Sequence, residues 1–193
     1  MSTTEPIKSK KDLTKFKDYY ERIHPNSRNA LLMTIGLNTA LRIGDILDLR
    51  WGDVYDFRQK SVKTHIRIHE QKTGKLNIIA INQPIKKKLK EFRTDHPTMQ
   101  KGDYLFQSQK HKGMALSRFQ AFRIIREAAE YAGIEEHISC HSLRKTFGYH
   151  AWKQGIPPVM LMKIFNHSSY QITMRYLCIE QDDKDEVFRK VML

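Results

Sequence analysis

Two arginines, two histidines and a tyrosine are the residues of this sequence best suited to chemistry on a phosphate. Arg42 stands between Thr-Ala-Leu and Ile-Gly-Asp, His141 and Arg144 lie in His-Ser-Leu-Arg, and His167 precedes Tyr176 by nine residues. Residues three apart share a helix face, so His141 and Arg144 can converge on one ligand. Helix starts, where the pattern puts the basic residues, offer free backbone N–H groups and the positive end of a dipole. This combination favours a site that binds an anionic phosphate group.

The elements that must position these residues are predicted to be mostly helices. Apolar residues recur at helical spacing in segments 13–23, 31–38, 43–49, 85–92, 117–133, 142–154, 158–165 and 172–177, with a last piece from Asp182 onward. Ser117 is expected to cap its helix and Gly133 to end it.

Between residues 62 and 80 the hydrophobic pattern changes to a period of two. The runs 62–68 and 76–80 alternate apolar and polar residues, which predicts a β-hairpin with residues 71–74 at its tip. Val54-Tyr55 is a candidate for a third, edge strand. The predicted fold class is therefore mostly α with a small antiparallel β-sheet (α+β).

The chain length and the net charge restrict the class of protein to which this sequence can belong. The chain has 193 residues, enough for one globular domain, and its 34 Lys and Arg against 21 Asp and Glu leave a net charge of +13. A polyanion such as nucleic acid is the leading partner for such a surface. No run approaches the roughly 20 apolar residues of a membrane span. Two cysteines and a polar N-terminus without a signal-peptide core predict a cytoplasmic protein.

Five motifs in a fixed order resemble the catalytic domain of the tyrosine recombinases, the phage integrase family. They are Ala-Leu-Arg-Ile-Gly-Asp, a lysine on a hairpin, His-Ser-Leu-Arg-Lys-Thr, Asn-His-Ser-Ser and Arg-Tyr, and the resemblance runs from about Leu13 to Ile179. It implies the integrase catalytic-domain fold and a site-specific recombinase that breaks and rejoins DNA in integration, excision or inversion. It implies no metal, ATP or other cofactor.

The arginines and histidines suit this chemistry. Arg42 and Arg144 present planar, permanently charged donors that can neutralise charge on the non-bridging phosphate oxygens. By resemblance, His141 assists as general base and His167 holds the phosphate. We expect Asp45 to hold Arg42 in place.

The nucleophile and the general acid are assigned by resemblance. Tyr176 would attack phosphorus and leave a 3′-phosphotyrosyl link with a free 5′-hydroxyl. Its rivals are Tyr149 and Tyr170, and the spacing from His167 favours Tyr176. Lys72, in Lys-Thr-Gly at the hairpin tip, would protonate the departing oxygen, with Lys75 as the alternative.

The sequence departs from the family pattern at two positions. Lys145 stands where the family usually has a second histidine, and Asn166 where it usually has glycine. Asparagine tolerates a left-handed backbone well, so neither change alters the expected reaction class. Basic residues predicted to contact DNA are Lys110, Lys112, Arg118, Arg123 and Lys145.

The resemblance also sets expectations for domains and partners. We expect a disordered polar N-terminus over 1–8, the catalytic domain over 9–181 and a C-terminal tail over 182–193, which is either exchanged between protomers or packed in cis. No further DNA-binding domain fits before Leu13, so the chain is expected to be a catalytic domain alone, as a fragment or as a naturally minimal recombinase. The partners would be double-stranded DNA and further copies of the chain, as a homo-tetramer on DNA, with a monomer as the alternative when DNA is absent; no membrane is expected as a partner. A type IB-like topoisomerase and a non-cutting DNA-binding regulator remain the alternatives.

Overall fold

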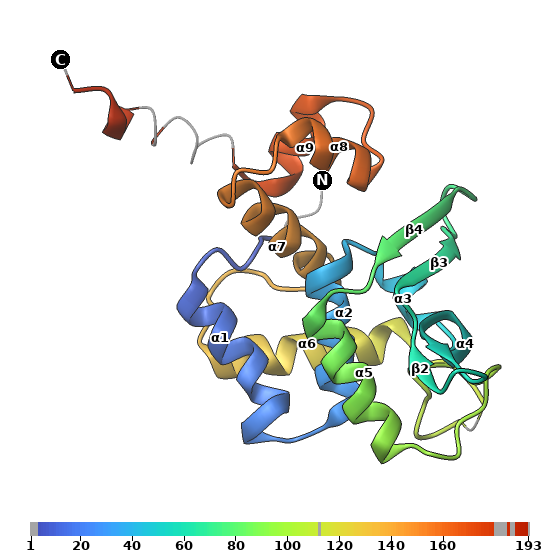
Figure 1. Ribbon diagram of the computed structural model, residues 1–193. Coiled ribbons are helices and arrows are strands. Elements are labelled where there is room, and N and C mark those ends of the chain that lie inside the picture. The colour runs from blue at the N-terminus through green and yellow to red at the C-terminus, as the bar shows by residue number, and fades with distance from the viewer. Residues whose placement is uncertain (1–3, 112, 180–184, 186–187, 193) are drawn as a thin grey trace.

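The computed structural model describes residues 4–111, 113–179, 185 and 188–192. Helices dominate, and α2 (Ser27–Thr39) runs through the centre of the larger part of the molecule (Figure 1). Around it lie α1 (Lys10–Asp18), which continues into the π-helical turn η1 (Tyr19–Ile23), α5 (Gln83–Asp95) and α6 (Arg118–Ala132). α7 (Cys140–Lys153) packs on α2 and carries α8 (Pro158–Phe165) and α9 (Tyr170–Leu177).

Helix ends follow the capping residues in the sequence. Ser117 caps α6 in a capping box with Gln120, and Gly133 ends the helix at a left-handed φ of 70°. Asn166 ends α8 with a φ of 54°. The predicted helices from residue 13 to 177, both ends of α6 and the left-handed backbone at Asn166 are thus confirmed, as is the mostly α fold class. Residues 182–184, 186–187 and 193 of the expected last piece lie outside the described residues.

The strands differ in one respect from the prediction. β3 (His65–His69) and β4 (Leu76–Ala80) form the expected antiparallel hairpin, but β1 (Tyr55–Asp56) pairs with β2 (Ser61–Val62) in a second two-stranded sheet. The expected strand at Tyr55 is therefore present and pairs with Val62, but it does not belong to the sheet of the hairpin, because the run 62–68 is divided into β2 and β3. The chain bends at Lys63–Thr64, and because the alternation of apolar residues continues across the bend, the pattern does not reveal it. Two short helices, α3 (Ile43–Leu47) and α4 (Trp51–Val54), precede the strands.

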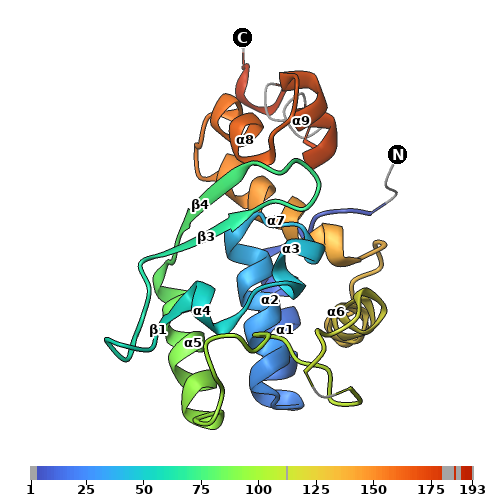
Figure 2. The same cartoon turned by 90° about the vertical axis from the view of Figure 1, so that its right-hand side faces the viewer.

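The core has two parts. The larger cluster surrounds α2 and includes Phe16, Trp51 and Phe106, and a smaller one joins α7 to α8 and α9 through Phe165 and Leu177. Figure 2 shows the β3–β4 hairpin rising beside α3 towards α8. The site residues thus lie where the helical body, the hairpin and the α8–α9 pair meet.

Candidate active site

Arg42 is held at the start of α3 by a sharp turn and a buried ion pair. α2 ends at Ala40, whose φ of 55° is left-handed, and Arg42 forms the N-cap of α3. Arg42 Nη1 donates a hydrogen bond of 2.7 Å to Glu70 Oε2, and only 6% of the Glu70 side chain is exposed. We expected Asp45 to hold Arg42, so Glu70 corrects that expectation. One signal pointed to Glu70: it follows Ile66 and Ile68 at a period of two, so it continues the inward face of the strand, where a charge needs a partner.

Asp45 connects α3 to the hairpin instead. Its Oδ1 accepts a hydrogen bond of 2.9 Å from the backbone N–H of Gln71. Its Oδ2 is buried and has no hydrogen-bond partner among the described residues. The contact brings the hairpin tip, with the exposed Lys72, next to the start of α3.

A surface hollow of about 460 Å³ lies between α3, the hairpin tip, and the starts of α6 and α7. Four basic side chains line it: those of Arg42, Lys72, Arg118 and His141. A Cβ atom on Gly44 would lie 2.7 Å from Arg118 Nη2 and 2.8 Å from a side-chain oxygen of the hairpin, so glycine makes room for the arginine. Such a concentration of cationic groups suits a phosphate.

Of the two lysines at the hairpin tip, only one lines this hollow. Lys75 Nζ donates a hydrogen bond of 3.2 Å to Asn166 Oδ1 and so links the hairpin to the end of α8. Lys72 lines the hollow beside Arg42 and His141; its role as general acid stays a prediction.

α7 positions His141 and Arg144 one turn apart. Ser139 caps the helix, the His141 side chain lies at the surface, and Arg144 is buried with 4% exposure. The Arg144 guanidinium donates to the carbonyl oxygens of Ala40 and of Phe165, the latter at 3.0 Å, and stacks over the Phe165 ring at 4.7 Å. It therefore joins the ends of α2 and α8.

The charges around His141 favour its neutral form. Burial lowers the pKa of His141, and the neighbouring Arg144, Lys145 and Arg42 lower it further. An imidazole that is neutral at neutral pH is able to accept a proton.

His167 and Tyr176 pack against each other. Their ring centroids are 4.9 Å apart, and both rings contact Phe165. His167 Nδ1 is 3.1 Å from Thr173 Oγ1, which orients the ring. Burial raises the pKa of Tyr176, and Arg144 and then Arg42 oppose the increase. The phenol is therefore protonated at neutral pH, while the positive charges of Arg144 and Arg42 favour its anion.

Lys145 is buried, which contradicts the expectation that it contacts DNA. It has 3% exposure, its Nζ donates to the Thr4 carbonyl oxygen, and the ammonium lies 5.2 Å from the centre of the Tyr176 ring. The physical reason is the course of the N-terminal residues, which cover this side of α7.

Residues 4–8, which we call the N-terminal strap, are ordered against α7 and not disordered as expected. The Ile7 N–H donates to Thr146 Oγ1 at 2.9 Å, and the Ile7 carbonyl oxygen lies 2.9 Å from His150 Nε2. Lys8 Nζ reaches the carbonyl oxygen of Cys178 at 3.1 Å. The strap therefore contacts both α7 and the end of α9. Residues 1–3 of the expected disordered segment lie outside the described residues.

The other predicted DNA contacts are spread over the surface. Lys110 is exposed, and Arg123, on the outer face of α6, forms a 3.9 Å ion pair with Glu127. Of this group, Arg118 lies in the hollow. Lys112 lies outside the described residues.

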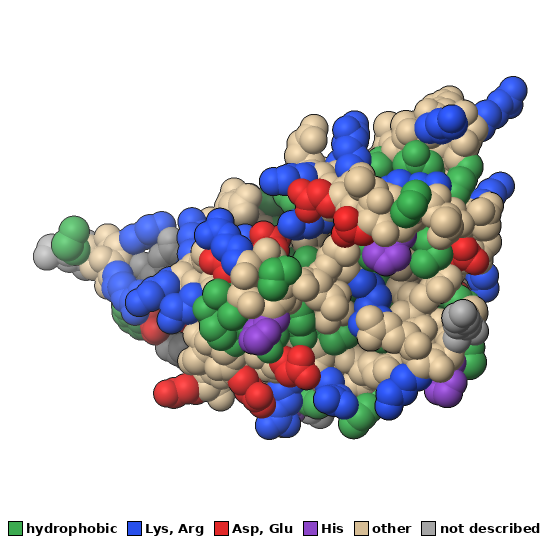
Figure 3. Space-filling view, turned by 90° about the horizontal axis from the view of Figure 1, so that it is seen from below, with side chains coloured by type: hydrophobic (Ala, Val, Ile, Leu, Met, Phe, Trp, Pro, Cys, Tyr) green, Lys and Arg blue, Asp and Glu red, His purple; other side chains and the backbone are tan. Residues whose placement is uncertain are grey.

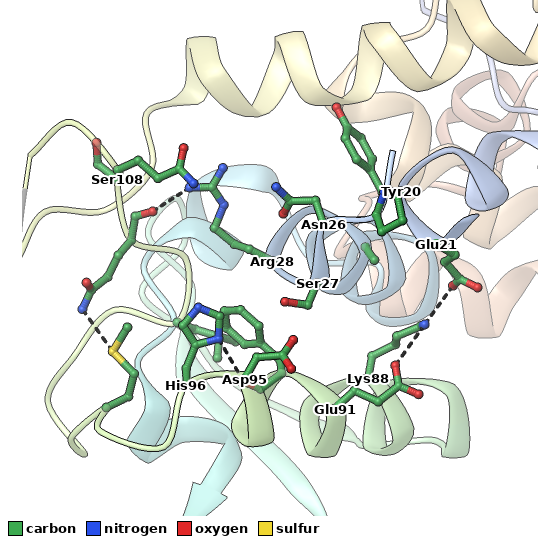
Figure 4. A pocket seen from close by; sticks show the side chains of 17 residues that line it. Tyr20, Glu21, Asn26, Ser27, Arg28, Lys88, Glu91, Asp95, His96 and Ser108 are labelled. Carbon is green, nitrogen blue, oxygen red and sulfur yellow. Dashed lines mark hydrogen bonds and ion pairs between the residues drawn. The ribbon is translucent and has the colours of Figure 1, made fainter. Parts of the chain in front are cut away.

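A larger cavity, of about 720 Å³, lies away from these residues, between η1, α2 and α5 (Figure 4). Its main charges are already paired: Lys88 contacts Glu21 at 3.4 Å and Glu91 at 3.1 Å, and Arg28 donates to the Gln107 carbonyl oxygen. On the face seen from below, acidic and basic side chains are interspersed (Figure 3). Acidic side chains thus balance the charge of this cavity, whereas the hollow is lined by Arg42, Lys72 and Arg118 against one acidic side chain, that of Asp45.

The described part of the chain contains no group of three metal-ligating side chains. It also has no helix with the length and apolar character needed to cross a bilayer.

Comparison with known proteins identifies the family. The pattern of the phage integrase family matches residues 9–182. The probable integrase/recombinase YoeC of Bacillus subtilis is 40% identical over 182 residues, which cover 94% of this chain and 93% of that protein. The chain therefore belongs to the phage integrase family.

More distant relatives are longer. The tyrosine recombinase XerD of Corynebacterium glutamicum is 28% identical over 84% of this chain and 52% of its own length. A crystal structure of the XerH site-specific recombinase bound to a difH substrate superimposes with a TM-score of 0.75 at 20% identity, covering 98% of this chain and 54% of that one. The chain thus spans about half the length of these two proteins, and the XerH structure confirms the integrase fold.

Proposed function

We propose that this protein is a tyrosine-type site-specific recombinase that cuts and rejoins DNA in integration, excision or inversion. The proposal rests above all on one observation: side chains from separate elements converge. Arg144 on α7 bonds to the Phe165 carbonyl oxygen and stacks over the ring that His167 and Tyr176 also contact, and Arg42 lines one hollow with His141. Relatives with 40% and 28% identity bear the names integrase/recombinase and tyrosine recombinase.

In the proposed cutting step, Tyr176 Oη attacks phosphorus and the bond from phosphorus to the 5′-oxygen breaks. The phenol is protonated at neutral pH because burial raises its pKa, so a base must take its proton, and the neutral His141 serves. Lys72 gives a proton to the departing 5′-oxygen. Arg42 and Arg144 stabilise the negative charge of the transition state, assisted by His167. The phosphotyrosyl bond retains the energy of the phosphodiester, so rejoining needs no ATP.

DNA binding must rearrange part of this site. Arg144 is 4% exposed and its donors already bond to two carbonyl oxygens, one of them of Phe165 at the end of α8. A phosphate can reach this guanidinium only if the side chains that cover it move. The same movement would free the half-buried Tyr176 to reach the phosphate.

The proposed partners are double-stranded DNA and further copies of the chain, as a homo-tetramer on DNA in the cytoplasm, with 9–181 as the catalytic domain. A net charge of +13 favours a polyanionic partner, and the neighbouring XerH structure is a complex with DNA. In the tail, Phe188 and Met192 are 81% and 89% exposed, which supports docking of this segment on a neighbouring protomer over packing in cis.

The test is covalent capture of DNA. The protein is incubated with a pool of nicked duplexes that carry a randomised segment, and DNA linked to protein is recovered and sequenced. Recovery of a defined site with wild-type protein but not with Tyr176→Phe supports the proposal, and recovery of none with either protein contradicts it. Strand exchange between two duplexes that carry the site then separates a recombinase from a topoisomerase, which would only relax supercoils.

A further inference from the structure

Glu70 is a buried acid in the middle of a basic site. It stands at the end of β3, directly before the hairpin tip, with 5% exposure. Its Oε2 accepts from Arg42 Nη1 at 2.7 Å and from Thr73 Oγ1 at 3.1 Å, and its Oε1 accepts from Asn77 Nδ2 at 2.9 Å. Three donors from two elements therefore satisfy one carboxylate.

These donors keep Glu70 charged. Burial alone would raise the pKa of Glu70, but the hydrogen bonds from Arg42 and Thr73 and the charge of Arg42 outweigh it, so the pKa lies below its usual range. The Arg42 guanidinium is therefore bonded to a carboxylate that is itself fixed by two further donors, Thr73 and Asn77. Glu70 thus restrains the direction in which the Arg42 guanidinium points.

The same carboxylate connects Arg42 to the hairpin tip. Thr73 is one residue from Lys72, and the Gly74 N–H donates to the Glu70 carbonyl oxygen at 2.8 Å. On the other side of Arg42, the Gln71 N–H bonds to Asp45 on α3. The hairpin tip that carries Lys72 is therefore linked to the start of α3 twice, through Glu70 to Arg42 and through the Gln71 N–H to Asp45.

We propose that Glu70 is a positioning residue of the strand-cutting reaction: it aims Arg42 at the phosphate and holds the Lys72-bearing tip in register with it. This inference rests on the proposed recombinase function. Without the carboxylate, Arg42 can turn away from the reacting phosphate although its charge remains in the site. Glu70 would then contribute to the rate of cutting but not to the affinity for DNA, since an acidic group disfavours a polyanion.

Glu70→Gln tests this inference, with Glu91→Gln as the matched control on α5. Glu91 pairs with Lys88 at 3.1 Å, far from the hollow. For each protein, the single-turnover rate of adduct formation and the dissociation constant are measured on the nicked duplex selected by covalent capture. We expect the rate of Glu70→Gln to fall about 10-fold or more, the scale of about 1.4 kcal/mol in the barrier, while its affinity stays the same or increases. Glu91→Gln should match wild type in both quantities.

The outcomes are separable. The positioning role is overturned if Glu70→Gln cuts at the wild-type rate. It is also overturned if the loss of rate is no greater than a parallel loss of affinity. Both results leave the recombinase function intact. No adduct with wild-type protein would overturn both the positioning role and the recombinase function. If circular dichroism shows that Glu70→Gln does not fold, Glu70→Asp decides: its displaced carboxylate should slow cutting several-fold at unchanged affinity, and an unchanged rate would overturn the inference.

Discussion

Gly148 allows α8 and α9 to close on α7, and its replacement by alanine should disturb the site from a distance. A Cβ atom at this position would lie 2.5 Å from Leu177 Cδ2 and 2.7 Å from Phe165 Cζ. Both neighbours are fully buried, so neither side chain has free space to enter. The α8–α9 pair, with His167 in the turn between the two helices and Tyr176 on α9, must therefore move away from α7.

The magnitude follows from two opposing effects. Overpacking a filled core costs about 1–3 kcal/mol, and the better helix propensity of alanine offsets about 1 kcal/mol. With two clashes against fully buried groups we expect the upper half of the range, a net loss of about 1–2 kcal/mol, which for a chain of this size lowers Tm by about 2–8 °C. Misplacing the nucleophile by a fraction of an ångström should slow adduct formation by about 10–100-fold.

Thermal unfolding and the rate of covalent adduct formation measure the two effects. Gly102→Ala is the control, because a Cβ atom there meets no atom within 4 Å, and it should behave as wild type in both assays. An unchanged or higher Tm together with a wild-type rate for Gly148→Ala would refute the close packing of α8 and α9 on α7.

Three further predictions address the charged groups. Lys72→Ala should slow cutting by about 100-fold or more, as loss of a general acid does, whereas Lys75→Ala should have little effect. A sulfur atom in place of the bridging 5′-oxygen is a leaving group that needs no proton, so such DNA should restore the rate of Lys72→Ala. Failure of this rescue would argue against the acid role. Because the pKa of His141 is lowered, its base form persists to lower pH, so the rate of cutting should decline only below about pH 6.5. A midpoint above that value in the rate–pH profile would contradict the assignment of His141 as the general base. Arg118→Gln should weaken DNA binding and reduce the slope of log K against log salt by about 1, while Lys145→Met, which removes a buried charge, should leave the slope unchanged.

The sequence predicted those features that depend on local periodicity and motif order. The helices, the capping of α6 and the position of the hairpin follow from apolar spacing and from residues such as Ser117 and Gly133, which act within a turn of their own position. Only the resemblance implied that Arg42, Arg144 and Tyr176 lie near one another, since the spacing of residues along the sequence does not define how α3, α7 and α9 pack.

What could not be predicted depends on contacts between distant residues. The period of two predicts that Glu70 faces inward, but not that its partner is Arg42, 28 residues away. Lys145 is buried by Thr4, 141 residues earlier in the chain. The sequence around a lysine that follows a motif arginine is the same whether its side chain is exposed to solvent or buried under another segment. Only the folded structure shows whether a lysine ammonium is free to bind a phosphate or already donates to a carbonyl oxygen, as that of Lys145 does.

The N-terminal strap has a practical consequence for handling this protein. Lys8 donates a hydrogen bond to the carbonyl oxygen of Cys178, two residues after Tyr176. A purification tag or a fusion partner joined close to the strap could therefore disturb the hydrogen bonds that hold the end of α9, the helix of the proposed nucleophile. A change in cutting caused by such a fusion would be mistaken for a property of the enzyme itself. Preparations compared with one another should therefore share an identical leader, or have the leader removed by a protease before rates are measured.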